Sequence, residues 1–236
     1  MVPITLVLMP GLDGTGEQFA PLLSALPDSL VPLVVRYPRD RALDYEALLP
    51  LVAAQLPTDA PFVLVGESFS GPLAIRIAAL APRGLCALVL VATFHRRPVA
   101  SWLALARPFA RAPMFARPPP AFVIRQLLAG SDAPDALVRS FRASSASVRR
   151  DVLALRVRAA LAVDVSSALA EVRVPIVYFA ASHDALLRAA IADELRALVP
   201  TLDVRSFATP HLLLQRQPRE AAAALAEIAA RAIMAT

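Results

Sequence analysis

The chain has 236 residues, of which 57% are hydrophobic, so it can bury the core of one large domain. Its longest apolar runs, such as residues 84–94, are too short to span a bilayer, and no basic leader precedes residues 4–9. A single cysteine, Cys86, excludes an intramolecular disulfide framework and a cysteine-rich zinc site. We therefore expect a cytoplasmic protein without a signal peptide or a membrane span.

The positive charge of the chain is concentrated in one segment. All 24 basic residues are arginines, and residues 94–173 contain 13 of them against five acids, whereas the rest of the chain is net acidic. The simplest interpretation is a solvated helix face, and the alternative is attraction of an acidic partner or an anionic substrate. No nucleic-acid-binding motif accompanies the charge, so we expect no binding to nucleic acid.

Short runs rich in Val, Ile and Leu recur along the chain without clean alternation, which is typical of strands buried on both faces. They occupy residues 4–9, 31–36, 62–66, 85–93, 175–181 and 202–207. Helical periods lie between most of them, at residues 16–26, 44–56, 69–81, 187–198 and 218–234. The alternation predicts an α/β fold, with a mostly parallel sheet of about six strands flanked by helices.

The alternation of strand and helix is interrupted once. Residues 94–172 contain several helical periods but no convincing strand, and a run of prolines at 118–120 ends whatever helix precedes it. This segment predicts a helical cap, inserted into a core formed by residues 1–93 and 173–236. The cap is also the arginine-rich part of the chain.

The stretch VGESFSGP at residues 65–72 places Ser68 between a predicted strand and a predicted helix. A serine at such a turn becomes a nucleophile when a base takes its proton, although the same letters also fit an ordinary polar turn. In the familiar pattern G-x-S-x-G the last position is glycine, whereas here it is Ser70 and the glycine follows at Gly71. Serine is only slightly larger than glycine, so we expect Ser70 to be tolerated and Gly71 to relieve the contact between helix and strand.

The base and the acid that Ser68 needs can be sought among the three histidines and the carboxylates at strand ends. His211 lies between the last predicted strand and the last helix, and Asp184 lies just past the strand at 175–181. His183, beside Asp184, is interpreted as a loop residue. His95 opens the insertion and is a candidate for the substrate pocket.

These stretches resemble the α/β-hydrolases. FVLVGESFSGPLAIRIAA resembles the nucleophile elbow of that superfamily, VPIVYFAASHDALL its acid-bearing strand and loop, and TPHLLLQRQPREAAAALAEI its histidine loop and final helix. The resemblance implies an α/β-hydrolase fold and a catalytic triad of Ser68 as nucleophile, His211 as base and Asp184 as acid. It implies no metal and no organic cofactor.

The resemblance also implies an oxyanion hole made of two backbone amides. One is that of Phe69, and the other comes from the loop MPGLDGTG at residues 9–16, where Leu12 matches the family position. Met9 and Pro10 depart from the His-Gly pair of the family. The glycines of this loop lack the spacing of a phosphate-binding loop, so we expect Asp13 to hold its turn by a hydrogen bond.

The activity that the resemblance implies is hydrolysis of a small-molecule carboxylic ester through an acyl-enzyme intermediate. Alternatives are a thioesterase or acyltransferase acting on a carrier-linked acyl group and, in another class, a catalytically silent binding module. The chain is somewhat similar to the pimeloyl-acyl-carrier methyl esterases, which receive an acidic carrier protein on a basic lid, so such a carrier is a candidate partner. Candidate pocket residues are His95, Trp102 and Phe122.

Overall fold

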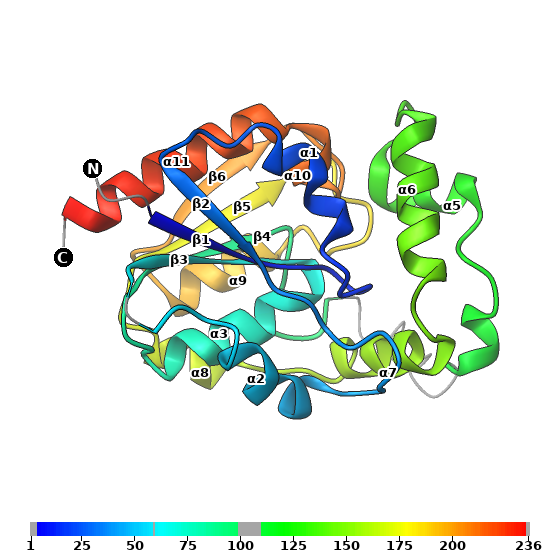
Figure 1. Cartoon of the computed structure of the whole chain (residues 1–236), viewed down its shortest axis with the longest axis horizontal. Coiled ribbons are helices and arrows are strands. Elements are labelled where there is room, and N and C mark those ends of the chain that lie inside the picture. The colour runs from blue at the N-terminus through cyan, green and yellow to red at the C-terminus, as the bar shows by residue number, and fades with distance from the viewer. Residues whose placement is uncertain (1–3, 59, 99–109, 235–236) are drawn as a thin grey trace.

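A parallel sheet forms the centre of the molecule. The computed structural model describes residues 4–58, 60–98 and 110–234, and its six-stranded sheet has the order β2-β1-β3-β4-β5-β6 (Figure 1). The strands are β1 Ile4–Met9, β2 Leu30–Val34, β3 Phe62–Glu67, β4 Leu85–Val91, β5 Ile176–Ala181 and β6 Asp203–Phe207. Every pairing between them is parallel. The predicted strands and the predicted parallel sheet are therefore confirmed.

Helices cover both faces of the sheet (Figure 1). One face carries α1 (Ala20–Leu23), α10 (Leu213–Arg216) and α11 (Pro218–Met234), and the other carries α2 (Tyr45–Ala53), α3 (Gly71–Ala79), α8 (Ser166–Glu171) and α9 (Ile191–Leu198). Successive strand residues point to opposite faces, so Val63 and Val65 join one core cluster while Phe62 and Leu64 join the other. Two apolar layers thus enclose strands that are buried on both sides.

The described helical elements between β4 and α8 lie beyond the carboxyl ends of the strands (Figure 1). They are η4 (Ala112–Phe115), α5 (Ala121–Ile124), η5 (Arg125–Ala129), α6 (Asp135–Ala146) and α7 (Arg150–Ala160). We call them the cap helices. The division of the chain at residues 94 and 172 stays a prediction, and α8, which that division assigns to the cap, packs against α3 and buries Leu169 in the core.

Membrane-spanning helices, metal ligands and the single cysteine can be checked in the described residues. No helix among the described residues is long and apolar enough to cross a membrane. In the same part of the chain, no three His, Cys, Asp or Glu side chains gather as metal ligands would. Cys86 is buried, as expected for a small side chain in an apolar strand.

The turn between β3 and α3 leaves no room for side chains at two glycines. A Cβ atom on Gly66 would lie 2.7 Å from Cβ of Ala74, and one on Gly71 would lie 1.9 Å from Oγ1 of Thr93. Thr93 is itself fixed, because its hydroxyl donates a hydrogen bond to the carbonyl of Ser68. The helix therefore approaches the end of β4 most closely at Gly71, which explains why glycine stands there.

Replacing Gly71 by alanine is expected to lower the free energy of unfolding by about 2 kcal/mol or more, because the new methyl group overlaps Thr93. Urea unfolding followed by circular dichroism measures the change. Gly11→Ala is the matched control at the same end of the sheet, since its Cβ atom would meet nothing nearer than 3.9 Å. An equal loss of unfolding free energy in the two variants would contradict the close contact assigned to Gly71 and Thr93.

Candidate active site

Ser68 lies at the end of the central strand β3, where the chain turns sharply into α3. Its φ of 50° falls in the left-handed region that non-glycine residues rarely adopt. The hydroxyl of Thr93 holds the Ser68 carbonyl, and the hydroxyl of Tyr45 donates to the carbonyl of Phe69 at 2.8 Å. These contacts fix a strained turn that presents the Ser68 side chain at the carboxyl edge of the sheet.

The structure brings Ser68, His211 and Asp184 together in a row. Oγ of Ser68 lies 2.9 Å from Nε2 of His211, and Nδ1 of His211 lies 2.7 Å from Oδ2 of Asp184. Asp184 follows β5, and His211 lies between β6 and α10. Both separations are hydrogen-bond distances, so the row can pass a proton from the serine to the imidazole.

The surroundings of Asp184 favour its ionised form. Burial acts to raise the pKa of Asp184, but the hydrogen bond and charge of His211 and the amides of Leu187 and Leu186 outweigh it and lower that pKa. These amides donate to Oδ1 at 3.0 and 2.8 Å, which leaves Oδ2 for His211. An ionised Asp184 accepts the Nδ1 proton of His211 and leaves Nε2 free to accept the proton of Ser68.

The loop after β1 lies against Ser68. A Cβ atom on Gly11 would be 3.9 Å from Cβ of Ser68, so this loop passes close to the Ser68 side chain. Oδ1 of Asp13 accepts the amide of Thr15 at 3.0 Å, which confirms that Asp13 holds the turn of this loop. Leu12 lines the same cavity as Ser68. Its amide and that of Phe69 stay the predicted oxyanion donors.

A cavity of about 910 Å³ lies between the loop after β1 and the cap helices. Ser68 and His211 line its floor, and Met114 and Phe115 of the cap contribute to its opposite wall. Further apolar side chains of the cap complete that wall: Pro118, Pro119, Pro120, Val123, Leu127, Leu128, Phe141, Val148 and Leu153. The space suits a mainly apolar small molecule placed against the serine.

Two of the candidate pocket residues, His95 and Phe122, lie outside the cavity lining. His95 does not line the cavity; it is buried beside the sheet, with Nε2 4.0 Å from Oε2 of Glu194. Phe122 is 68% exposed and points away from the cavity that its neighbour Val123 lines. Neither residue lines the cavity as expected: helical periodicity does not say which face of the short helix α5 meets the cavity, and His95 follows β4 and packs toward Glu194 of α9. Trp102 lies outside the described residues.

No family model matches the sequence, and no curated protein matches it. Solved structures do match over almost the whole chain. MenH from S. aureus is 17% identical with a TM-score of 0.80, covering 97% of this chain and 94% of that one. A carboxylesterase of Nitrososphaera gargenis is 14% identical, with a TM-score of 0.79 and coverage of 99% and 92%. A lipase-esterase related protein from Clostridium acetobutylicum is 14% identical, with a TM-score of 0.78 and coverage of 96% and 94%.

The chain has the α/β-hydrolase fold. The expected fold class is thus confirmed. Residues 9–16, which contain one of the predicted oxyanion donors and which we call the oxyanion loop, are joined to the rest of the candidate site by buried polar contacts.

Ser70 is one of these ties, a role that its sequence position did not predict. It is fully buried, its hydroxyl donates to the carbonyl of Pro10, and it accepts a hydrogen bond from the hydroxyl of Tyr37. Burial raises the pKa of Tyr37, so that its hydroxyl stays a donor. A glycine at position 70 would leave Tyr37 and Pro10 without this partner, so Ser70 joins the serine turn to the oxyanion loop.

Arg156 in α7 is a second tie and corrects the sequence interpretation, which grouped it with solvated arginines. Its side chain is fully buried. Nη1 donates to the carbonyls of Leu12 and Asp13 at 3.0 and 2.8 Å, and Nη2 donates to the carbonyl of Pro38 at 2.9 Å. The guanidinium also lies 5.4 Å from the ring centre of Tyr37. One cap arginine therefore joins the middle of the oxyanion loop to the backbone at Pro38.

The sequence carried a signal for this burial. Arg156 stands four residues after Val152, which is fully buried, so both lie on the same face of α7. Burial lowers the pKa of Arg156, although Tyr37 and Asp13 act in the opposite direction. Arginine rarely occupies such a face unless its donors find partners, and here three carbonyl oxygens accept hydrogen bonds from Nη1 and Nη2.

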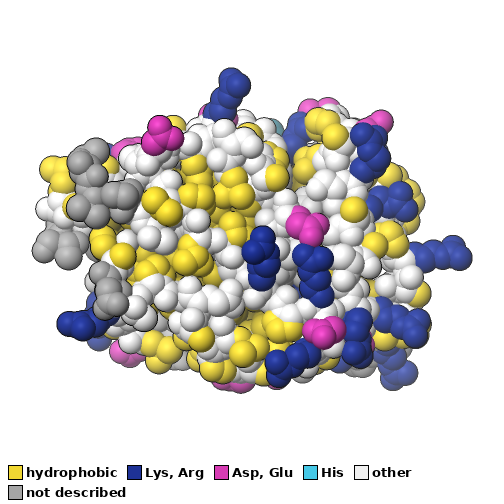
Figure 2. Space-filling model, viewed as in Figure 1, with side chains coloured by type: hydrophobic (Ala, Val, Ile, Leu, Met, Phe, Trp, Pro, Cys, Tyr) yellow, Lys and Arg dark blue, Asp and Glu magenta, His cyan; other side chains and the backbone are white. Residues whose placement is uncertain are grey.

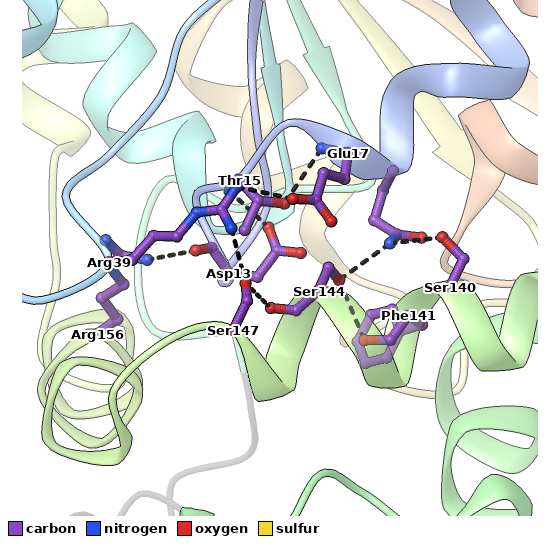
Figure 3. Close-up of polar contacts among 10 residues, drawn as sticks. Asp13, Thr15, Glu17, Arg39, Ser140, Phe141, Ser144, Ser147 and Arg156 are labelled. Atoms are coloured by element: carbon purple, nitrogen blue, oxygen red, sulfur yellow. Dashed lines mark hydrogen bonds and ion pairs between the residues drawn. The ribbon is translucent and has the colours of Figure 1, made fainter.

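Helix α6 of the cap meets the end of the same loop through side-chain hydrogen bonds (Figure 3). Nε2 of Gln18 donates to Oγ of Ser144 at 3.0 Å and to Oγ of Ser140 at 3.3 Å. Arg39 joins Oε1 of Glu17 at 2.7 Å to Oγ of Ser147 at 3.1 Å. Figure 3 shows Ser140, Ser144 and Ser147 at α6 facing the segment that carries Glu17. The cap helices are thus hydrogen-bonded to the catalytic edge of the sheet.

Glu67 is a buried carboxyl next to Ser68. Its Oε1 accepts a hydrogen bond from Nε2 of Gln215 at 2.9 Å, which ties β3 to α10, one turn beyond His211. Burial raises the pKa of Glu67 to about 7, although Gln215 and His211 act to lower it. Glu67 therefore changes its charge near neutral pH while it lines the floor of the cavity.

Arg156→Met is expected to lower the free energy of unfolding by about 3 kcal/mol or more, because three backbone carbonyls lose their donor in a buried place. Urea unfolding at neutral pH measures it. Arg139→Met is the matched control, since Arg139 is exposed on α6. If Arg156→Met were as stable as Arg139→Met, Arg156 would not stabilise the fold through these carbonyl groups.

Glu67 is also expected to make stability depend on pH. Because its pKa is about 7 in the fold and 4.5 as a free side chain, its stabilising contribution is complete below pH 4.5 and is lost as the pH rises through 7. The difference in unfolding free energy between the wild type and Glu67→Gln should therefore fall by about 3 kcal/mol over this range. Urea unfolding at several pH values tests this, with Glu220→Gln, an exposed position, as control. A pH-independent difference would refute it.

Proposed function

We propose that this protein is a serine hydrolase that cleaves a carboxylic ester through an acyl-enzyme intermediate. The observation that carries the proposal is the row of hydrogen bonds from Ser68 through His211 to Asp184, at 2.9 and 2.7 Å, on the floor of an apolar cavity. A nucleophile, a base and an orienting acid in this geometry are what acyl transfer requires. In this proposal, residues 1–93 and 173–236 supply the row and residues 94–172 cover it.

The first half of the proposed reaction forms the acyl-enzyme. Nε2 of His211 takes the proton of Ser68 as Oγ bonds to the carbonyl carbon of the ester, and Asp184 stabilises the resulting imidazolium. The amides of Leu12 and Phe69 donate to the negative carbonyl oxygen, each contributing roughly 3 to 4 kcal/mol to the transition state. The imidazolium then returns its proton to the departing alcohol oxygen as the bond between carbon and that oxygen breaks.

The second half of the reaction hydrolyses the acyl-enzyme. Nε2 of His211 takes a proton from water, the water oxygen bonds to the acyl carbon, and the proton returns to Oγ of Ser68 as the acid leaves. These steps use protein groups and water. Arg156 and Ser70 support them indirectly, because they hold the loop that carries the amide of Leu12.

The nature of the cavity favours a small-molecule acyl ester as substrate. Its lining is mostly apolar, and its volume of about 910 Å³ is within the usual range for drug-sized ligands. Solved structures with this fold include proteins described as a carboxylesterase and an esterase, which supports ester hydrolysis at the level of the fold. Cleavage of a thioester would use the same acyl-enzyme, and an acidic carrier protein at the arginine-rich cap stays a prediction.

A fluorophosphonate probe tests the proposal directly. The wild type should bind one equivalent of probe at neutral pH, and Ser68→Ala should bind none, because the phosphonyl group bonds to the activated serine oxygen. Asp184→Asn should lower kcat for p-nitrophenyl butyrate by roughly 10³-fold or more, since the histidine loses its orienting acid. Mass spectrometry and initial rates give the two readouts.

The matched control is Ser145→Ala, which removes another serine that lines the cavity without touching the row. It should be labelled like the wild type. Folded wild-type protein that is not labelled, or Ser68→Ala that still is, would refute the proposal and favour a catalytically silent binding module.

A further inference from the structure

The two sides of the cavity differ in charge. On the floor, the acidic side chains that line it are Asp13 and Glu67, both buried and both from the core. On the cap side, the charged residues that line it are Arg117, Arg142 and Arg150. The cavity therefore has the serine and the carboxyl groups at one end and the guanidinium groups at the other, and an elongated molecule bound in it would meet both ends.

The three arginines come from different cap elements. Arg117 follows η4, Arg142 lies in α6 and Arg150 begins α7, and η4 packs against α7. All three side chains are exposed to solvent at the cavity rather than buried in the cap. Figure 2 shows arginine side chains gathered on the side of the molecule that the cap helices occupy. We call the three residues the arginine rim.

The acids of the cap helices do not neutralise this rim. Asp132 pairs with Arg216 at 2.6 Å, Asp151 pairs with Arg149 at 2.8 Å, and Asp135 pairs with Arg125. None of these acids lines the cavity. Within the described residues, the members of the arginine rim form no ion pair, so their charge faces the cavity mouth uncompensated.

The other arginines of the cap helices have different surroundings. Arg125 and Arg149 are in ion pairs, Arg156 is buried on backbone carbonyls, and Arg158 donates to the carbonyl of Ala110 at 2.8 Å. Arg139 is exposed on α6, away from the cavity. Arginines left without a protein partner are thus concentrated at the cavity, which a uniformly solvated helix face would not require.

We infer that the arginine rim is an anion-binding subsite, and that the preferred ester carries a carboxylate at the end of its acyl chain, away from the scissile bond. Guanidinium groups bind carboxylates through paired, charge-assisted hydrogen bonds. The apolar wall between rim and serine, including Phe115 and Leu153, would hold the chain. Among the described residues, the charged side chains that line the floor from the core are carboxyl groups and no guanidinium, so the carboxylate would bind at the rim and the ester carbonyl would lie at Ser68.

The inference deepens the proposed ester hydrolysis and is tested by two esters of equal length. Mono-p-nitrophenyl suberate carries a terminal carboxylate, and p-nitrophenyl octanoate is its neutral counterpart. The wild type should have the higher kcat/KM for the suberate ester, and the ratio of the two values should fall at least about tenfold in the double variant Arg142→Gln/Arg150→Gln. High salt should lower the ratio in the wild type, since screening weakens exposed charge pairs.

Arg139→Gln is the control, because it removes one positive charge from α6, the helix that carries Arg142, at a position that does not line the cavity. It should leave the ratio as in the wild type. A ratio unchanged in the double variant would overturn the inference, and so would an equal fall in Arg139→Gln, which would indicate a diffuse field of the whole cap.

A binding measurement separates failure of this inference from failure of the proposed function. Monomethyl suberate is titrated calorimetrically into Ser68→Ala, with and without the double substitution in the arginine rim. Loss of binding in the rim variant supports the subsite even if no ester is turned over. Equal binding overturns it even if both p-nitrophenyl esters are hydrolysed.

Discussion

The turn at Ser68 brings strand β3 and helix α3 so close together that the backbone itself becomes part of the packing. Gly66 and Gly71 have no space for a side chain, and Ser68 adopts a left-handed conformation between them. Such a turn is unfavourable alone and persists only where its surroundings fix it. Here hydroxyl groups of Thr93 and Tyr45 hold the carbonyls of Ser68 and Phe69. The position of Ser68 therefore depends on side chains distant in sequence.

The parallel sheet explains how the partners of Ser68 reach it. Carboxyl ends of parallel strands meet at one edge, so the loops after β1, β3, β5 and β6 converge there although they are far apart in sequence. The hydrogen bonds of Ser70 and Arg156 then join the oxyanion loop to the serine turn and to the cap. A change in the cap could thus reach the chemistry through the backbone of Leu12 and Asp13 without touching the serine.

The sequence predicted what depends on local pattern. Buried strands are continuous apolar runs, and a serine between strand and helix, a carboxylate after one strand and a histidine after another can be read in order along the chain. Long-range packing decided the rest. Whether Arg156 is solvated depends on carbonyls of the oxyanion loop and of Pro38, and whether His95 meets the pocket depends on Glu194 in α9. The sequence around Arg156 or His95 does not reveal these distant partners.

The cap arginines show that one residue type serves two physical roles in a chain without lysine. Burying the guanidinium of Arg156 is tolerable because its charge is spread over a planar group whose donors match several carbonyl oxygens. The arginine rim is exposed, so it retains hydration and can exchange water for an anion at little cost in desolvation. Net charge alone does not separate these roles. The contacts of each guanidinium distinguish them: Arg156 holds the oxyanion loop, and the arginine rim is left open to a ligand.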